Sequence, residues 1–162
     1  MYDVVVIGGG PVGSYTAYKL AETGHGVVVL EQKEKLGEPV CCTGIIGQEC
    51  VDLFDINNNV ILRQANSASL FSPSGKQLRL WREQTQACII DRAAFDQAMA
   101  SRAQSKGAKY ILNSLVRGVE VSNDKVRVEA THGRERLSFE ARAAVIATGF
   151  GSSLTERLGL GK

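Results

Sequence analysis

The sequence predicts an α/β fold in which helices cover a sheet that is parallel at its centre. The first observation is a pair of short, almost continuously apolar segments, residues 2–7 and 27–30, of the kind found in strands buried on both faces. The second is the amphipathic helical segment between them, which opens with a glycine turn. The third is a later run of segments that alternate apolar and polar residues, which adds antiparallel strands.

A glycine motif joins the first strand to the helix. Gly8, Gly10 and Gly13 form GxGxxG, in which the first glycine allows a tight turn, the second lets a pyrophosphate approach the backbone, and the third lets helix and strand pack closely. Pro11 suits the first helical turn, whose free amides favour an anion. Glu31 ends the second strand near the spacing expected for an acid that binds ribose hydroxyls. Together these features predict a Rossmann-like, FAD/NAD(P)-binding fold rather than a glycine turn without a nucleotide.

Composition and charge exclude several other classes. The chain has 162 residues, of which 44% are hydrophobic and 22% charged, as expected of one globular domain. Lysine and arginine number 19 against 17 acids, with no basic block, so nucleic-acid binding is not expected. Apolar runs are too short to span a bilayer, and Tyr2 and Asp3 stand where a signal peptide would be cationic. We therefore expect a cytoplasmic protein.

The elements after Glu31 do not continue the regular alternation of strand and helix expected of a nicotinamide-binding domain. They are expected in this order: a loop to residue 46, a helix near 48–54, a hairpin over 68–81, a strand at 87–91, a helix over 92–105 and a strand at 108–112. Asp91 is the expected N-cap of the 92–105 helix. A three-stranded antiparallel meander is expected at 115–121, 125–130 and 136–141, followed by a last buried strand at 143–149.

Neither a metal site nor a disulfide framework is expected. The spacing of the candidate side chains does not match that of zinc ligands, and disulfides are rare in a reducing compartment. These side chains are Cys41, Cys42, Cys50, Cys88, His25 and His132. The adjacent pair Cys41 and Cys42, in the stretch "PVCCTGII", therefore needs another explanation.

The order of elements resembles the FAD-binding domain of the two-dinucleotide-binding flavoprotein superfamily, and within it the geranylgeranyl reductase family. The resemblance is carried by "VIGGGPVGSYTAYKLAETGHGVVVLE", by "GEPVCCTGII", and by "IIDRAAFDQAMASRAQSKGAKY" with "AAVIATGFGSSLTERLGL". It covers nearly the whole chain. It implies an FAD-binding domain over residues 1–162, in which the hairpin and strand at 69–90 lie on the substrate side.

The resemblance also implies where FAD would bind. Glu31 would hold the adenosine ribose, the Val116 backbone would meet the adenine edge, and Arg92 would reach the phosphate or ribityl region. For Arg92, the alternative is an ordinary solvent-exposed arginine. The cofactor-binding residues implied in this way are Gly8, Gly10, Pro11, Val12, Gly13, Glu31, Gln32, Cys42, Thr43, Gly44, Arg92, Val116, Ala147, Thr148 and Gly149.

The same family resemblance places the cysteine loop beside the flavin. Cys42, Thr43 and Gly44 would border the isoalloxazine ring, where a thiol could shape the pocket, donate a weak hydrogen bond or act as an acid toward the substrate. The alternative is that Cys41 and Cys42 are small buried residues that pack the loop.

The implied activity is reduction of isoprenoid carbon–carbon double bonds by an FAD-dependent oxidoreductase. The electron donor would be NAD(P)H or a ferredoxin-type protein, and a lipid substrate would bring the full-length enzyme to a membrane surface. A second FAD motif and a substrate domain are expected beyond Lys162, so this portion alone is expected to be inactive.

Two alternatives remain at this level. One is an FAD-dependent aromatic hydroxylase or monooxygenase, which is disfavoured because Ala147-Thr148-Gly149 stands where those enzymes carry alanine-aspartate-glycine. The other is a dinucleotide-binding module without turnover.

Overall fold

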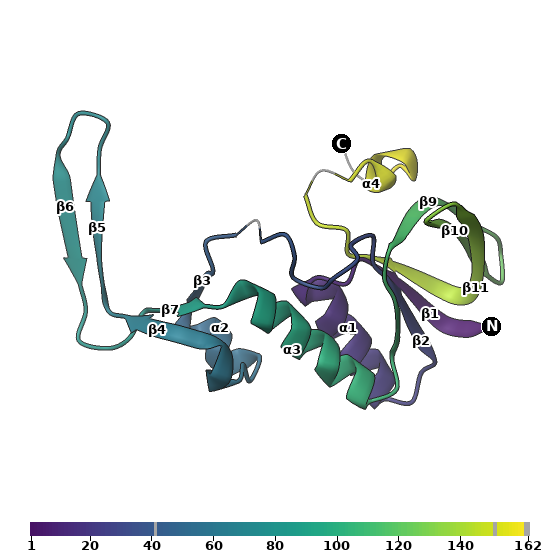
Figure 1. Cartoon of the computed structure of the whole chain (residues 1–162), viewed down its shortest axis with the longest axis horizontal. Helices are drawn as coiled ribbons and strands as arrows, with labels where there is room; N and C mark the ends of the chain where they lie inside the picture. Colours follow the sequence, from purple (N-terminus) through teal and green to yellow (C-terminus); the bar gives the residue numbers. More distant parts are fainter. Residues whose placement is uncertain (41, 151, 161–162) are drawn as a thin grey trace. The chain divides into compact units, whose positions relative to one another are not determined.

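The computed structural model describes residues 1–40, 42–150 and 152–160 (Figure 1). These residues form two compact units. Unit 1 comprises Met1–Glu38 and the chain from Asp96 onward, and unit 2 comprises Pro39–Phe95. The prediction of a single FAD-binding domain with a substrate-side segment at 69–90 stays a prediction.

Unit 1 is built on a six-stranded sheet with the strand order β8-β2-β1-β11-β10-β9. Its strands are β1 (Tyr2–Ile7), β2 (Val27–Leu30), β8 (Lys109–Ile111), β9 (Ser114–Val121), β10 (Val126–His132) and β11 (Glu135–Ile146). The pairs β1–β2, β1–β11 and β2–β8 are parallel, whereas β10 is antiparallel to both β9 and β11. The predicted α/β fold, with a parallel centre and an antiparallel meander, is therefore confirmed.

One prediction about this sheet is wrong. The segments 136–141 and 143–149 were expected as two strands, but Glu135–Ile146 forms a single strand, β11, and residues 147–149 lie beyond its end. At Ala141 its partners change: this residue stands opposite Val126 in the antiparallel ladder and opposite Tyr2 in the parallel one. No glycine or proline interrupts the segment, so the change of neighbour requires no break in the extended backbone.

The two faces of the sheet carry different apolar clusters, because alternate residues of a strand point to opposite sides. On one face α1 (Pro11–Glu22) and α3 (Arg92–Ser105) contribute small side chains, so that helix and sheet approach closely. This cluster contains Val4, Val6, Val27, Val29, Ala17, Ala21, Ala103 and Ala108. On the other face the meander and the short helix α4 (Leu154–Arg157) cover Val5, Ile7, Val28 and Leu30.

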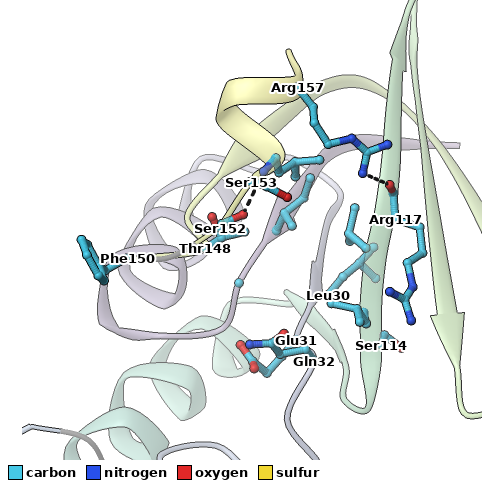
Figure 2. Close-up of a pocket in the computed structure, with 15 residues that line it drawn as sticks. Leu30, Glu31, Gln32, Ser114, Arg117, Thr148, Phe150, Ser152, Ser153 and Arg157 are labelled. Carbon is cyan, nitrogen blue, oxygen red and sulfur yellow. Dashed lines mark hydrogen bonds between the residues drawn. The ribbon is translucent and has the colours of Figure 1, made fainter. Parts of the chain in front are cut away.

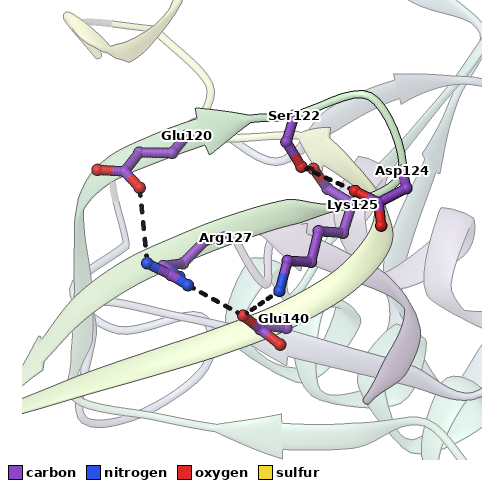
Figure 3. A network of polar contacts seen from close by, with 6 residues as sticks. All are labelled: Glu120, Ser122, Asp124, Lys125, Arg127 and Glu140. Carbon is purple, nitrogen blue, oxygen red and sulfur yellow. Dashed lines mark hydrogen bonds and ion pairs between the residues drawn. The ribbon is translucent and has the colours of Figure 1, made fainter.

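A polar network lies on the meander (Figure 3). Glu140 of β11 accepts hydrogen bonds from Lys125 Nζ at 2.8 Å and from Arg127 Nη2 at 3.2 Å. Arg127 Nη1 also lies 3.9 Å from a carboxylate oxygen of Glu120 on β9. These contacts, with the one to Lys125 first, hold the pKa of Glu140 below its ordinary value. Because the side chains are solvent-exposed, the network contributes little to stability.

Unit 2 contains a three-stranded antiparallel sheet in the order β3-β7-β4 and a separate hairpin, β5–β6. Its elements are β3 (Ile45–Gly47), α2 (Gln48–Leu53), the 3₁₀ helix η1 (Asn58–Val60), β4 (Ile61–Ala65), β5 (Ser67–Phe71), β6 (Gln77–Trp81) and β7 (Ala87–Ile90). The predicted short helix, hairpin and strand are confirmed. β4 was not predicted, and the expected loop to residue 46 is wrong at its end, where Ile45–Gly47 forms β3 and pairs with β7. The Ala94 N–H donates to Asp91 Oδ1 at 3.0 Å, which confirms the predicted N-cap of α3.

The β5–β6 hairpin is exposed throughout. Its large apolar side chains are Leu70, Phe71, Leu78, Leu80 and Trp81, each at least half exposed. Within the described ranges, no helix is long and apolar enough to cross a bilayer.

Candidate functional site

The glycine turn after β1 has the backbone geometry that the motif predicts. Gly8 has φ of 107°, and its N–H donates to the Leu30 carbonyl at 2.8 Å. A side-chain carbon at Gly8 would clash with the Ala147 carbonyl, and one at Gly13 would clash with the Gly8 carbonyl. These two glycines are therefore required by the packing of the protein itself.

Gly10 differs from its two neighbours in the motif. Apart from its neighbours in the chain, a side-chain carbon built at this position would meet no atom within 4 Å, so the chain's own packing does not require a glycine. Its Cα faces an open surface at the start of α1, where unpaired amides and the helix dipole favour an anion. A pyrophosphate fits such a surface.

Glu31 lies at the end of β2 with its carboxylate held in place. The side chain is buried, with 7% of its surface exposed. The Gly9 N–H donates to Oε2 at 2.6 Å, and the Lys33 N–H donates to Oε1 at 2.8 Å. Each carboxylate oxygen can accept more than one hydrogen bond, so these contacts leave acceptor capacity for a ribose hydroxyl.

A pocket of about 330 Å³ opens beside these residues within unit 1 (Figure 2). It lies between the ends of β1 and β2, the start of β9, and the segment from residue 148 through α4. The predicted residues that line it are Gly8, Glu31, Gln32, Val116 and Thr148. The lining residues that were not predicted are Ile7, Leu30, Ser114, Leu115, Arg117, Phe150, Ser152, Ser153, Leu154 and Arg157.

The other predicted residues of unit 1 flank this pocket in the chain. Pro11, Val12 and Gly13 form the first turn of α1, and Ala147 and Gly149 stand on either side of Thr148. Ala147 continues the sheet hydrogen bonding, because its N–H donates to the Ile7 carbonyl at 2.8 Å. The contacts of all these residues with a cofactor stay predictions.

A β-bulge shapes the side of the pocket formed by β9. Glu129 pairs with Gly118 and the next residue, Ala130, pairs with Val116, so Arg117 is the extra residue. The Arg117 carbonyl accepts a hydrogen bond from Arg157 Nη1 at 2.8 Å, as Figure 2 shows. This bond ties α4 to β9.

In unit 2 the cysteine loop brings four predicted residues together. The Gly44 N–H lies 3.5 Å from the Cys42 sulfur, and the Gly44 carbonyl accepts from the Ile90 N–H at 2.8 Å. The Gly44 amide contact lowers the pKa of the Cys42 thiol, with smaller contributions from Arg92 and Thr43. Cys42 is exposed, so the packing alternative is wrong for this residue. Cys41 lies outside the described residues.

Cys88 differs from Cys42 in both its burial and the direction of its pKa shift. It is fully buried in β7, and burial raises the pKa of its thiol. In the part of the chain that the structure describes, no three His, Cys, Asp or Glu side chains gather as metal ligands do.

The glycine turn, the held carboxylate and the mixed sheet define a dinucleotide-binding flavoprotein module. The chain belongs to the FAD dependent oxidoreductase family, whose sequence profile matches residues 3–39 and 61–162. The predicted cofactor, FAD, is that of the family. The profile does not match residues 40–60, where the cysteine loop lies.

Within this family, the chain is similar to individual lipid reductases. The chain is 31% identical to the digeranylgeranylglycerophospholipid reductase of Methanocaldococcus jannaschii over 99% of its own length and 41% of the relative's. It is 29% identical to the enzyme of the same name from Methanococcus vannielii, again over 41% of the relative. The chain thus spans about two fifths of the length of the curated relatives it matches.

Solved structures agree with this assignment. A geranylgeranyl bacteriochlorophyll reductase-like protein from Thermoplasma acidophilum superposes with a TM-score of 0.88 at 30% identity, over 98% of this chain and 42% of that one. The p-nitrophenol 4-monooxygenase of Pseudomonas putida has a TM-score of 0.83 at 20% identity over 98% of this chain and 44% of that one, which shows a shared fold alone. The predicted membership of the FAD-dependent oxidoreductases is confirmed, and the chain is similar to geranylgeranyl reductase-like proteins.

Proposed function

We propose that the whole protein is an FAD-dependent reductase of isoprenoid carbon–carbon double bonds, and that this chain supplies the adenosine and pyrophosphate side of its FAD site. The observation that carries the proposal is the open surface at Gly10 beside the buried, fixed carboxylate of Glu31. The names of the two curated relatives described above support an isoprenoid lipid as the substrate class.

The residues of unit 1 have separate roles in this proposal. Amides at the start of α1 hold the pyrophosphate, with Gly10 leaving room for it. Glu31 and Gln32 accept hydrogen bonds from the adenosine ribose, and the backbone at Val116 meets the adenine edge. When bound, the flavin supplies the redox chemistry, and the protein orients it and excludes water.

The cysteine loop has its own part in the proposal. Cys42, Thr43 and Gly44 border the ring of the flavin on the substrate side, and Arg92 keeps the Cys42 thiol in a cationic environment. A thiol whose pKa is lowered exchanges its proton more readily near neutral pH than an ordinary cysteine. This supports Cys42 as a group that donates a proton to the substrate.

The remaining parts of the proposal concern the full-length protein. The electron donor is NAD(P)H or a ferredoxin-type protein, and the enzyme works in the cytoplasm with its lipid substrate drawn from a membrane surface. A hydroxylase on the same fold is disfavoured, because Thr148 replaces the aspartate of the hydroxylase motif.

The cofactor assignment is tested by titrating the purified chain with FAD, ADP and NAD and following heat release and flavin absorbance. We expect FAD and ADP to compete for one site. Protection against thermal unfolding by NAD, with no response to FAD or ADP, would contradict the proposal.

The reaction is tested on the full-length protein. After anaerobic reduction, a reductase should transfer electrons to an isoprenoid alkene without oxygen, whereas a hydroxylase should require oxygen and insert one of its atoms into the substrate. Product masses from the two conditions separate the two enzymes.

A further inference from the structure

A chain of two hydroxyl groups, one part-buried on Tyr110 and one fully buried on Ser14, connects β8 to the glycine turn. The Tyr110 hydroxyl donates to Ser14 Oγ at 2.9 Å, and Ser14 Oγ donates to the Gly9 carbonyl at 3.0 Å. Ser14 is completely buried in the first turns of α1. A tyrosine hydroxyl is protonated at neutral pH and can donate, and burial raises the pKa of Tyr110 further.

These bonds fix the peptide that joins Gly9 to Gly10. In a trans peptide the carbonyl and the N–H point in opposite directions. Because Ser14 holds the Gly9 carbonyl toward the helix, the Gly10 N–H is turned away from it. Among residues 1–40, 42–150 and 152–160, no hydrogen bond takes up that N–H, and the Cα of Gly10 faces open space.

The preceding peptide is fixed as well. The Gly9 N–H is bound by Glu31, so Gly9 is held at its nitrogen by an acid and at its carbonyl by a serine. Two consecutive peptides thus have set orientations before any ligand arrives. Such preorganisation raises affinity, because less ordering remains to be done on binding.

The tyrosine hydroxyl is not needed for packing. The Tyr110 ring packs against the cluster formed by β1, β2 and α1, and a phenylalanine ring would fill the same volume. A buried hydroxyl is unfavourable unless it is hydrogen-bonded, and a serine that accepts a hydrogen bond donates its own more strongly. The Tyr110 hydroxyl therefore strengthens the hydrogen bond from Ser14 to the Gly9 carbonyl, which the ring alone cannot do.

We propose that Tyr110, acting through Ser14, is a positioning residue that aims the Gly10 N–H at the pyrophosphate of the bound dinucleotide. This inference rests on the dinucleotide site proposed above. Tyr110 and Ser14 are thereby expected to affect binding of the phosphate part of the ligand and to make no contact with its adenosine part.

The test compares ADP, which carries a pyrophosphate, with adenosine, which does not. Affinities are measured by calorimetry for the wild-type chain and for Tyr110→Phe, Ser14→Ala and the double variant. Loss of one neutral hydrogen bond should weaken ADP binding about fivefold to tenfold in Tyr110→Phe, with adenosine binding changed less than about twofold. The double variant should bind ADP no more weakly than Ser14→Ala, because Tyr110 acts through Ser14.

Tyr18→Phe is the matched control. The Tyr18 hydroxyl donates to Glu22 Oε1 on the exposed side of the same helix, so its removal should leave ADP binding unchanged. If Tyr110→Phe does not fold, Ser14→Ala tests the same link from its other end.

Three results would overturn the proposal in distinguishable ways. Equal losses for ADP and adenosine would show that the pair supports the fold only. Unchanged ADP affinity in both single variants would show that the peptide keeps its orientation without them. A wild-type chain that binds neither ADP nor FAD would remove the dinucleotide site itself, before any variant is compared.

Discussion

At the scale of single residues, the three glycines of the motif differ in why a glycine is needed: Gly8 and Gly13 for packing, and Gly10 for the proposed ligand. Gly10→Ala adds a methyl group that meets no protein atom within 4 Å but occupies the surface proposed for the phosphates. We expect a melting temperature close to that of the wild type and a loss of ADP affinity of at least about tenfold, or 1.4 kcal/mol. Thermal unfolding and calorimetry measure the two quantities.

Gly13→Ala provides the comparison for this prediction. Its methyl group would collide with the Gly8 carbonyl, so the variant should lose roughly 2 kcal/mol or more of stability. Wild-type ADP affinity in Gly10→Ala would contradict the placement of the phosphates.

The pKa of Cys42 gives a prediction about reactivity. Because the Gly44 amide and Arg92 favour the thiolate, iodoacetamide should alkylate Cys42 at lower pH than an ordinary cysteine. Arg92→Ala removes part of that effect, so the pH profile should move to higher pH. The experiment uses mass spectrometry in a Cys41→Ser background.

Cys88 is the internal control for this experiment. It is buried and its pKa is raised, so it should stay unmodified in the folded protein. A profile for Cys42 that does not respond to Arg92→Ala would contradict the assigned role of the arginine.

At the scale of elements, α4 depends on one long-range hydrogen bond. Its four residues cannot form a stable helix alone, and Arg157 anchors them to the Arg117 carbonyl at 2.8 Å. Arg157→Ala should accelerate hydrogen exchange of the Leu158 N–H, which donates to Leu154, while amides of β10 keep their wild-type protection. Unchanged exchange at Leu158 would show that apolar burial of Leu154 suffices.

The sequence was most informative where signals are local. Apolar runs and the glycine turn were enough to predict β1, α1 and β2, and alternation was enough for the meander. The short strand β4, with only its two end residues partly buried, has no such pattern and was missed. The division between meander and last strand was wrong because a change of pairing partner leaves no mark in residue type.

The site was predictable to a similar extent. Motif spacing singled out Gly8, Glu31 and Gln32, which line the pocket, although their contacts with a cofactor stay predictions. Arg117 and Arg157 were not predicted, because their contact depends on the register of β9 against β10, which frees one carbonyl. The bond between Ser14 and Tyr110 joins residues far apart in sequence, and neither is unusual in its local segment.

At the scale of the whole molecule, the chain corresponds to about two fifths of its curated relatives. We expect this chain alone to bind FAD weakly, in competition with ADP, and to reduce no double bond with any donor. Each absent hydrogen bond to the rest of the cofactor would remove about 1 kcal/mol, so several lower the affinity by orders of magnitude. Retention of FAD through gel filtration, or steady turnover, would contradict this expectation.

The pairing of β1 with β11 has a consequence for synthesis on the ribosome. β1 is translated well before the strand that covers one of its edges, because that strand is complete only at Ile146. Until then this apolar strand has a free row of amides and carbonyls, which is the kind of edge that recruits foreign strands. Translation speed and chaperone occupancy over this interval should therefore influence how much of the protein escapes aggregation.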